Sequence, residues 1–253
     1  MVSLVPMKIA SVFLRLFYVA WVTVMLIWIS LDGLNWFDAE KKDDKSVISF
    51  NLHPLMMSLG VLVLMSEAVI SYRVYEAVHG FSHMSAKRIH SGLQLSAMIF
   101  MAVGLTIVFK NHKEKAIPHL YTAHSWIGVG VTSLMALQAL GGVLAFFVNT
   151  NSNLKTLMLP VHRYTGIATY MLAVAAILMG LQEKSTFLKG SPQCASNAYC
   201  SQIIFANVLS VLAVLIAALT TSMLAADVKP LERTNSQETP LLASESTAHH
   251  QTI

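Results

Sequence analysis

Four of the ten histidines lie inside long apolar segments, where an ionisable side chain is costly and indicates a function. His53, His90, His124 and His162 each lie near the start of such a segment. Because successive membrane helices alternate in direction, we expect His53 and His124 at one membrane face, and His90 and His162 at the other. His53 and His124 are 71 residues apart in the sequence, and His90 and His162 are 72 apart. Two similar helical hairpins, offset from each other, would give such nearly equal separations.

Two imidazoles that face each other from different helices can bind one haem iron from both sides. This ligation leaves no open position on the iron, so the haem transfers electrons and does not activate oxygen. Each histidine lies about one and a half turns inside its segment, so a core of about 30 Å would separate the two irons by roughly 15–20 Å. A single buried histidine is more often a packing residue, but four histidines paired by face favour haem ligation.

Six apolar segments have the length needed to position these histidines in a bilayer. Only 12% of the 253 residues are charged, against about a quarter in a soluble domain. The mean hydropathy is +0.60. The sequence therefore predicts an all-α, six-helix transmembrane bundle with two b haems between helices 2–5, and no nucleic-acid partner. The predicted helices are 9–31, 47–72, 87–109, 120–148, 157–181 and 202–226.

The segments outside the bundle are short and polar. We expect residues 1–8 to form a short cytosolic N-terminus, 9–226 the membrane domain and 227–253 a disordered cytosolic tail. The first apolar segment is too long for a signal peptide, so we expect it to be retained. All five arginines fall on the side of the two termini, which favours cytosolic termini.

Two further features bear on the compartment. The tail contains an imperfect dileucine-type sorting signal at 238–242, which favours an endomembrane (lysosomal or vacuolar, endosomal or secretory vesicle) over the plasma membrane. Cys194 and Cys200 share the loop between the last two helices, and either a disulfide or two free thiols would fit this spacing.

The chain contains the motifs Phe50-Asn51-Leu52-His53-Pro54, Glu67-Ala68 through Tyr72-Arg73, Thr122-Ala123-His124-Ser125-Trp126, Pro160-Val161-His162, Gly180-Leu181-Gln182-Glu183-Lys184 and Ala206-Asn207-Val208-Leu209. Together these motifs resemble those of the cytochrome b561 family of ascorbate-dependent transmembrane electron carriers. The resemblance covers residues 9–226. It implies a homodimer with cytosolic termini and two haems, one between His53 and His124 and the other between His90 and His162.

The resemblance also implies substrate sites at both membrane faces. Lys87 and Lys155 match basic positions that hold cytosolic ascorbate, and His83 falls on a third such position. Arg73 is the candidate for a haem propionate. On the opposite face, His112 matches an acceptor-binding position. Two more residues complete the predicted sites, Arg88 beside Lys87 and Tyr121 beside the outer haem. A basic cluster facing lipid headgroups is the alternative reading of Lys87, Arg88 and Lys155.

The predicted function is transmembrane electron transfer from cytosolic ascorbate to a ferric chelate or monodehydroascorbate on the other side. Two alternatives stay open. A quinol-linked di-haem cytochrome would take electrons from a lipid-soluble donor. A channel or transporter would use the histidines for a metal ion or protons, although a metal site needs its ligands in one coordination sphere.

Overall fold

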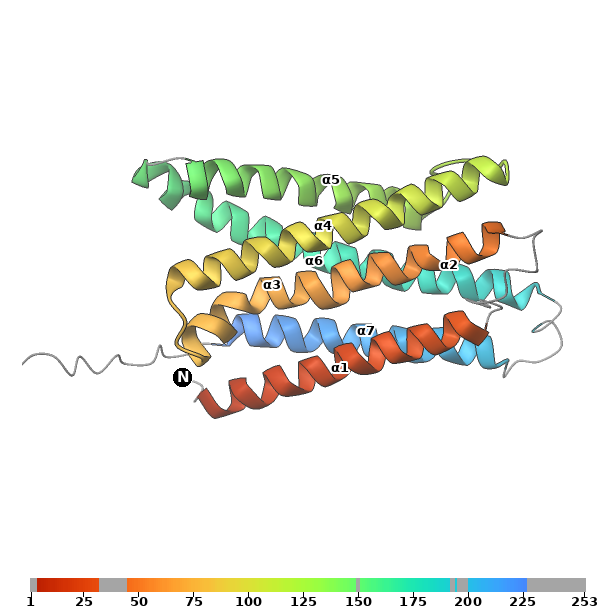
Figure 1. The fold of residues 1–253 in the computed structure, drawn as a ribbon, viewed down its shortest axis with the longest axis horizontal. Helices are drawn as coiled ribbons and strands as arrows, with labels where there is room; N and C mark the ends of the chain where they lie inside the picture. The colour runs from red at the N-terminus through yellow and green to blue at the C-terminus, as the bar shows by residue number, and fades with distance from the viewer. Residues whose placement is uncertain (1–3, 32–44, 149–150, 192–193, 195–199, 227–253) are drawn as a thin grey trace, which may run out of the picture.

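The computed structural model describes residues 4–31, 45–148, 151–191, 194 and 200–226 (Figure 1). Within these residues six helices are long and apolar enough to cross a bilayer, which confirms the predicted six-helix bundle. Their components are α1 (Leu4–Leu31); α2 (Lys45–Ser58), η1 (Leu59–Met65), α3 (Ser66–Ser71) and η2 (Tyr72–Val78); α4 (His83–Glu114); α5 (Ala123–Val143) and η3 (Leu144–Val148); α6 (Ser152–Lys189); and α7 (Ser201–Ala225).

Helix ends differ from the predicted ones because polar caps, rather than apolar residues, set them. The Ser82 hydroxyl accepts from the Ser85 N–H at 3.1 Å, so α4 begins at His83 instead of residue 87. The Asn151 side chain accepts from the Asn153 N–H at 2.9 Å and starts α6 at Ser152 instead of residue 157. Side-chain caps of this kind satisfy the free N–H groups of a first helical turn.

The second membrane helix is continuous but not uniform. Its π-helical segments η1 and η2 flank the six-residue α3. π segments are rare and often occur at functional sites. The helix also runs to Val78, beyond the predicted end at residue 72, because η2 continues past the apolar run.

The helices pair along the bundle in a way that groups the histidine-bearing ones. The α2–η2 helix packs on α4, α5 packs on α6, and α1 packs on α7 (Figure 1). Between the last pair, the buried Trp21 indole donates to the Leu209 carbonyl at 3.2 Å. The start of α1 and the end of α7 lie at the same end of the bundle.

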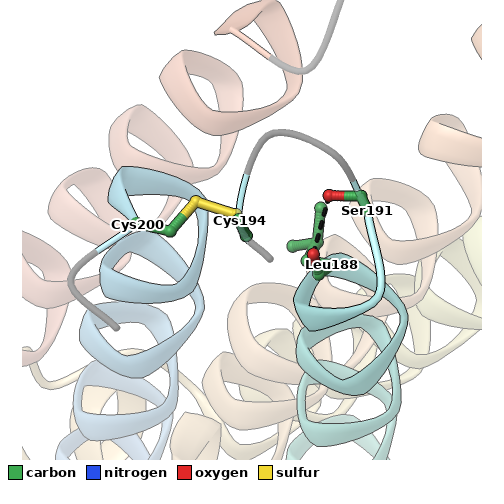
Figure 2. Close-up of a disulfide and its surroundings, with 4 residues drawn as sticks. All are labelled: Leu188, Ser191, Cys194 and Cys200. Carbon is green, nitrogen blue, oxygen red and sulfur yellow. Dashed lines mark hydrogen bonds between the residues drawn. A yellow bond between two sulfur atoms is a disulfide. The ribbon is translucent and has the colours of Figure 1, made fainter. Parts of the chain in front are cut away.

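A disulfide joins Cys194 and Cys200, with Cα atoms 5.3 Å apart (Figure 2). Of the two readings that the sequence left open, the structure therefore has the disulfide. It links the segment after α6 to the start of α7, at the opposite end from the start of α1. Residues 1–3, the acidic connection 32–44 and the tail 227–253 with its dileucine-type signal lie outside the described residues.

Candidate functional site

The four histidines meet as two pairs of rings. His53 on α2 faces His124 on α5, with ring centroids 6.2 Å apart and ring planes at 82°. His90 on α4 faces His162 on α6, again at 6.2 Å and at 71°. A metal–imidazole bond of about 2 Å and about 1 Å from nitrogen to ring centroid, counted on both sides, give about 6 Å. Each pair therefore has the spacing of two imidazoles that share one metal ion.

Backbone carbonyls fix the orientation of three of these rings. The Nδ1 atom of His53 donates to Gly104 O at 2.9 Å, and that of His124 donates to Ala176 O at 2.8 Å. The Nδ1 atom of His90 donates to Ala68 O at 2.8 Å. Because a carbonyl can only accept, each neutral ring carries its proton on Nδ1, which leaves Nε2 with a free lone pair. This arrangement is typical of histidines that bind metals.

Glycines make room for two of the rings. A Cβ on Gly180 of α6 would lie 2.8 Å from Cε1 of His124 on α5. Only glycine at this position leaves room for the His124 ring against α6. A Cβ on Gly142 would lie 3.4 Å from His162 Cε1. The His162 ring also meets the Phe146 ring edge-on at 5.5 Å. Small residues on the neighbouring helix thus shape both sites.

A large, mostly apolar cavity of ≈ 610 Å³ is lined by His53 and His124. Ligand sites in proteins typically enclose about 300–1,000 Å³. Aromatic and aliphatic side chains from α1, α2, α4, α5 and α6 line it, among them Trp21, Phe109 and Phe187. An apolar cavity with two convergent imidazole nitrogens fits a b-type haem. Among the described residues, no three His, Cys, Asp or Glu side chains converge as a bare metal ion would require.

Basic residues surround the His90 end of the bundle. The Lys87 ammonium donates to Phe146 O at 2.5 Å and lies 4.1 Å from the centroid of the Phe147 ring. Lys155 and Arg73 are half-buried and Arg88 is exposed. Lys87 is therefore already held by η3, which carries the phenylalanine that packs on His162.

His83 lies at the same end but is paired with an acid. Its Nδ1 atom lies 2.9 Å from Glu76 Oε2. The His83 ring lies 5.4 Å from Tyr72, and Tyr72 lies 5.6 Å from His90. Aromatic contacts thus lead from an exposed histidine to the inner histidine pair.

A second aromatic cluster borders the cavity at the opposite end. The rings of His112 and His119 stack at 5.5 Å, and His112 lies 6.0 Å from Tyr121. The Tyr121 hydroxyl donates to Glu183 at 3.5 Å. Burial and the Glu183 carboxylate raise the pKa of Tyr121. The sequence pointed to His112 and Tyr121 but not to His119 or Glu183, which only the fold brings beside them.

Comparisons with known proteins found a matching family model and several similar relatives. Residues 52–188 match the model of the eukaryotic cytochrome b561 family. A probable ascorbate-specific transmembrane electron transporter of Oryza sativa is 35% identical over 84% of this chain and 86% of its own length. A plasma membrane ascorbate-dependent reductase of Xenopus laevis is 36% identical over 66% of this chain and 57% of its own length. A lysosomal membrane ascorbate-dependent ferrireductase of Bos taurus is 35% identical over 68% and 64%, respectively.

Proposed function

The chain belongs to the eukaryotic cytochrome b561 family, and we propose that it carries electrons from ascorbate across a membrane to a ferric chelate or monodehydroascorbate. The observation that carries the proposal is the pair of facing imidazoles near each end of the bundle, 6.2 Å apart in both cases. The ascorbate-dependent reductase and ferrireductase relatives support the same donor and acceptor classes.

Two b haems are the proposed cofactors, since the family binds haem and the chain offers two ligand pairs. His53 and His124 would hold one haem, and His90 and His162 the other. A haem ligated by two histidines accepts and releases one electron at a time. Carbonyls of Gly104, Ala176 and Ala68 hold the rings of His53, His124 and His90, and a mostly apolar lining surrounds the His53–His124 pair. We further propose Arg73 as a propionate partner.

The disulfide supports the proposed direction of transfer. Disulfides persist in oxidising compartments, so the end that bears Cys194 and Cys200 would face the lumen or the exterior. The start of α1 and the end of α7 lie at the other end, which would face the cytosol. The donor would therefore meet the His90 end, and the acceptor the His53 end.

The donor site would use the cytosolic basic residues. Lys87, Lys155 and Arg88 carry the positive charge that a monoanionic donor needs. Lys87 is bonded to Phe146 O, so donor binding would share or take over this ammonium. His83 Nδ1 lies 2.9 Å from Glu76 Oε2, so this ring is already engaged by a carboxylate.

The acceptor site would use the opposite aromatic cluster. His112 and Tyr121 border the cavity around His53 and His124, and His119 and Glu183 lie beside them. Imidazole and carboxylate groups can bind a ferric chelate at the surface. The chain is a multi-pass membrane protein, and its relatives include lysosomal and plasma membrane reductases. We propose an endomembrane location and, from the family resemblance, a homodimer.

The test is a spectral titration of the purified protein with ascorbate and dithionite. We expect two haems per polypeptide in the native protein, and about half of that content in His53→Ala and in His90→Ala, since each variant loses one ligand pair. A colourless native protein would favour the transporter alternative. Reduction by a quinol but not by ascorbate would favour the quinol-linked cytochrome.

A further inference from the structure

A charged pair lies within two of the membrane-spanning helices, outside the residues proposed to bind substrate. Arg15 Nη2 on α1 donates to Glu67 Oε1 on α3 at 2.5 Å. The Tyr75 hydroxyl donates to the same oxygen at 2.9 Å. The Glu67 side chain is only 10% exposed and that of Arg15 39%. Charges at this depth are costly and are therefore expected to have a function.

The carboxylate is adjacent in sequence to the group that orients His90. Glu67 precedes Ala68, whose carbonyl accepts from His90 Nδ1 at 2.8 Å. Both residues belong to α3, which is only six residues long and has a π segment on each side. The helix stays hydrogen-bonded through these segments, and π segments of this kind often occur at functional sites.

Besides its packing on α4 and α7, α3 makes specific polar contacts. The bond from Arg15 connects Glu67 to α1. The bond from Tyr75 connects Glu67 to η2, the segment that follows α3 in the same helix. On another side, Ser66 Oγ and Tyr170 OH of α6 are 2.7 Å apart. These bonds attach α3 to two neighbouring helices. Any rotation that broke them would also turn the Ala68 carbonyl away from the His90 ring.

We propose that Glu67 is a positioning residue for His90, and that the ion pair with Arg15 sets the direction of the Ala68 carbonyl. The inference rests on the proposed role of His90 as a haem ligand. Glu67 acts through the backbone and touches neither substrate nor haem. Removing its charge would loosen the contact of α3 with α1, so that the Ala68 carbonyl could shift and constrain the His90 ring less, while the His53 site on α2 and α5 would keep its own carbonyl bonds.

The test compares the two haem centres in Glu67→Gln. Loss of an outer partner of a metal-binding histidine typically lowers affinity about 10- to 100-fold. The Ala68 carbonyl remains in this variant, so we expect haem titration of the apoprotein to show one centre weakened by up to about this factor, with a shifted electron paramagnetic resonance signal and midpoint potential. The other centre should be unchanged. The affected centre is identified as the one that His90→Ala lacks.

Matched variants separate positioning from stability. Glu114→Gln changes a carboxylate in the exposed pair with Lys110 and should move neither centre. Glu67→Asp keeps the charge and should restore part of the lost affinity. If Glu67→Gln does not accumulate because Arg15 is left unpaired, the double variant Arg15→Met with Glu67→Met buries no unpaired charge and should show the same selective weakening.

Two outcomes would overturn the inference. In the first, Glu67→Gln lowers the melting temperature but leaves both centres with native affinity and spectra. In the second, both centres change equally, which would indicate a general loss of packing. Either result would leave the proposed electron transfer intact if the native protein still binds two haems. A native protein without haem would instead contradict the proposed function.

Discussion

Replacing Gly180 by alanine should remove one haem selectively, because the new methyl group would collide with the His124 ring. The added Cβ would lie 2.8 Å from Cε1 and 3.2 Å from Nδ1 of that ring, whereas ordinary contacts begin at 3.4 Å. The ring would have to retreat by at least about 0.6 Å, while metal–ligand distances tolerate about 0.2 Å. The retreat would also lengthen the bond from His124 Nδ1 to Ala176 O.

The cost follows from these two effects. Overpacking in a close-packed site costs about 1–3 kcal/mol, and a lost hydrogen bond about 1 kcal/mol. Together they correspond to a loss of roughly 30- to 1,000-fold in haem affinity at the His53–His124 site. The assay is haem titration of the apoprotein, followed at the Soret band, with the retained haem per polypeptide as a second readout.

Two other glycines supply matched controls. Gly142→Ala places its Cβ at 3.4 Å from His162 Cε1, at the limit of ordinary contact, so it should weaken the other site only slightly. Gly130 on α5 is exposed and lies outside the cavity lining, and an added Cβ there meets nothing within 4 Å, so Gly130→Ala should bind both haems normally. Full haem content and an unchanged spectrum in Gly180→Ala would refute the steric reasoning.

Three more predictions concern the two ends of the bundle. Lys87→Ala should slow reduction by ascorbate far more than reduction by dithionite, because the ammonium held at Phe146 O is the proposed anion partner; equal slowing in stopped-flow traces would remove it from the donor site. Cys200→Ser opens a disulfide between residues six apart and should lower the free energy of unfolding by about 2 kcal/mol, to be measured by denaturation in detergent; no change would contradict the expected constraint. Burial and Glu183 raise the pKa of Tyr121 in the folded protein. The protonated hydroxyl therefore stabilises the fold, and this contribution is complete below the unfolded pKa of about 10. It is lost as the pH rises through the folded pKa. The melting temperatures of the native protein and Tyr121→Phe should therefore converge above about pH 10, and a constant difference would argue against this account.

The membrane helices were predictable because long apolar runs carry a strong signal, whereas their ends were not. Hydropathy does not register the hydroxyl and amide caps at Ser82 and Asn151, which extend α4 and α6 beyond the apolar stretch. The π segments on either side of α3 likewise leave no mark in composition. Apolar periodicity predicts that a helix forms, but local capping and packing decide where it ends.

The candidate site was predictable in its side chains but not in what orients them. Alternating helix direction placed His53 with His124 and His90 with His162 at the two ends of the bundle. The carbonyls that hold three of these rings could not be foreseen, since every residue carries one. Contacts across long separations, such as Arg15 with Glu67 or Lys87 with Phe146, depend on how the helices are rotated against each other.

Three of the four histidine rings are held by main-chain oxygens, which makes their orientation robust to mutation. A carbonyl at Gly104, Ala68 or Ala176 persists whatever side chain stands there, so no single exchange can delete the acceptor. Harmful variants should instead act by bulk or by bending the helix. Genetic variation that damages this protein is therefore expected at small residues facing the imidazoles, such as Gly180, as well as at the histidines themselves.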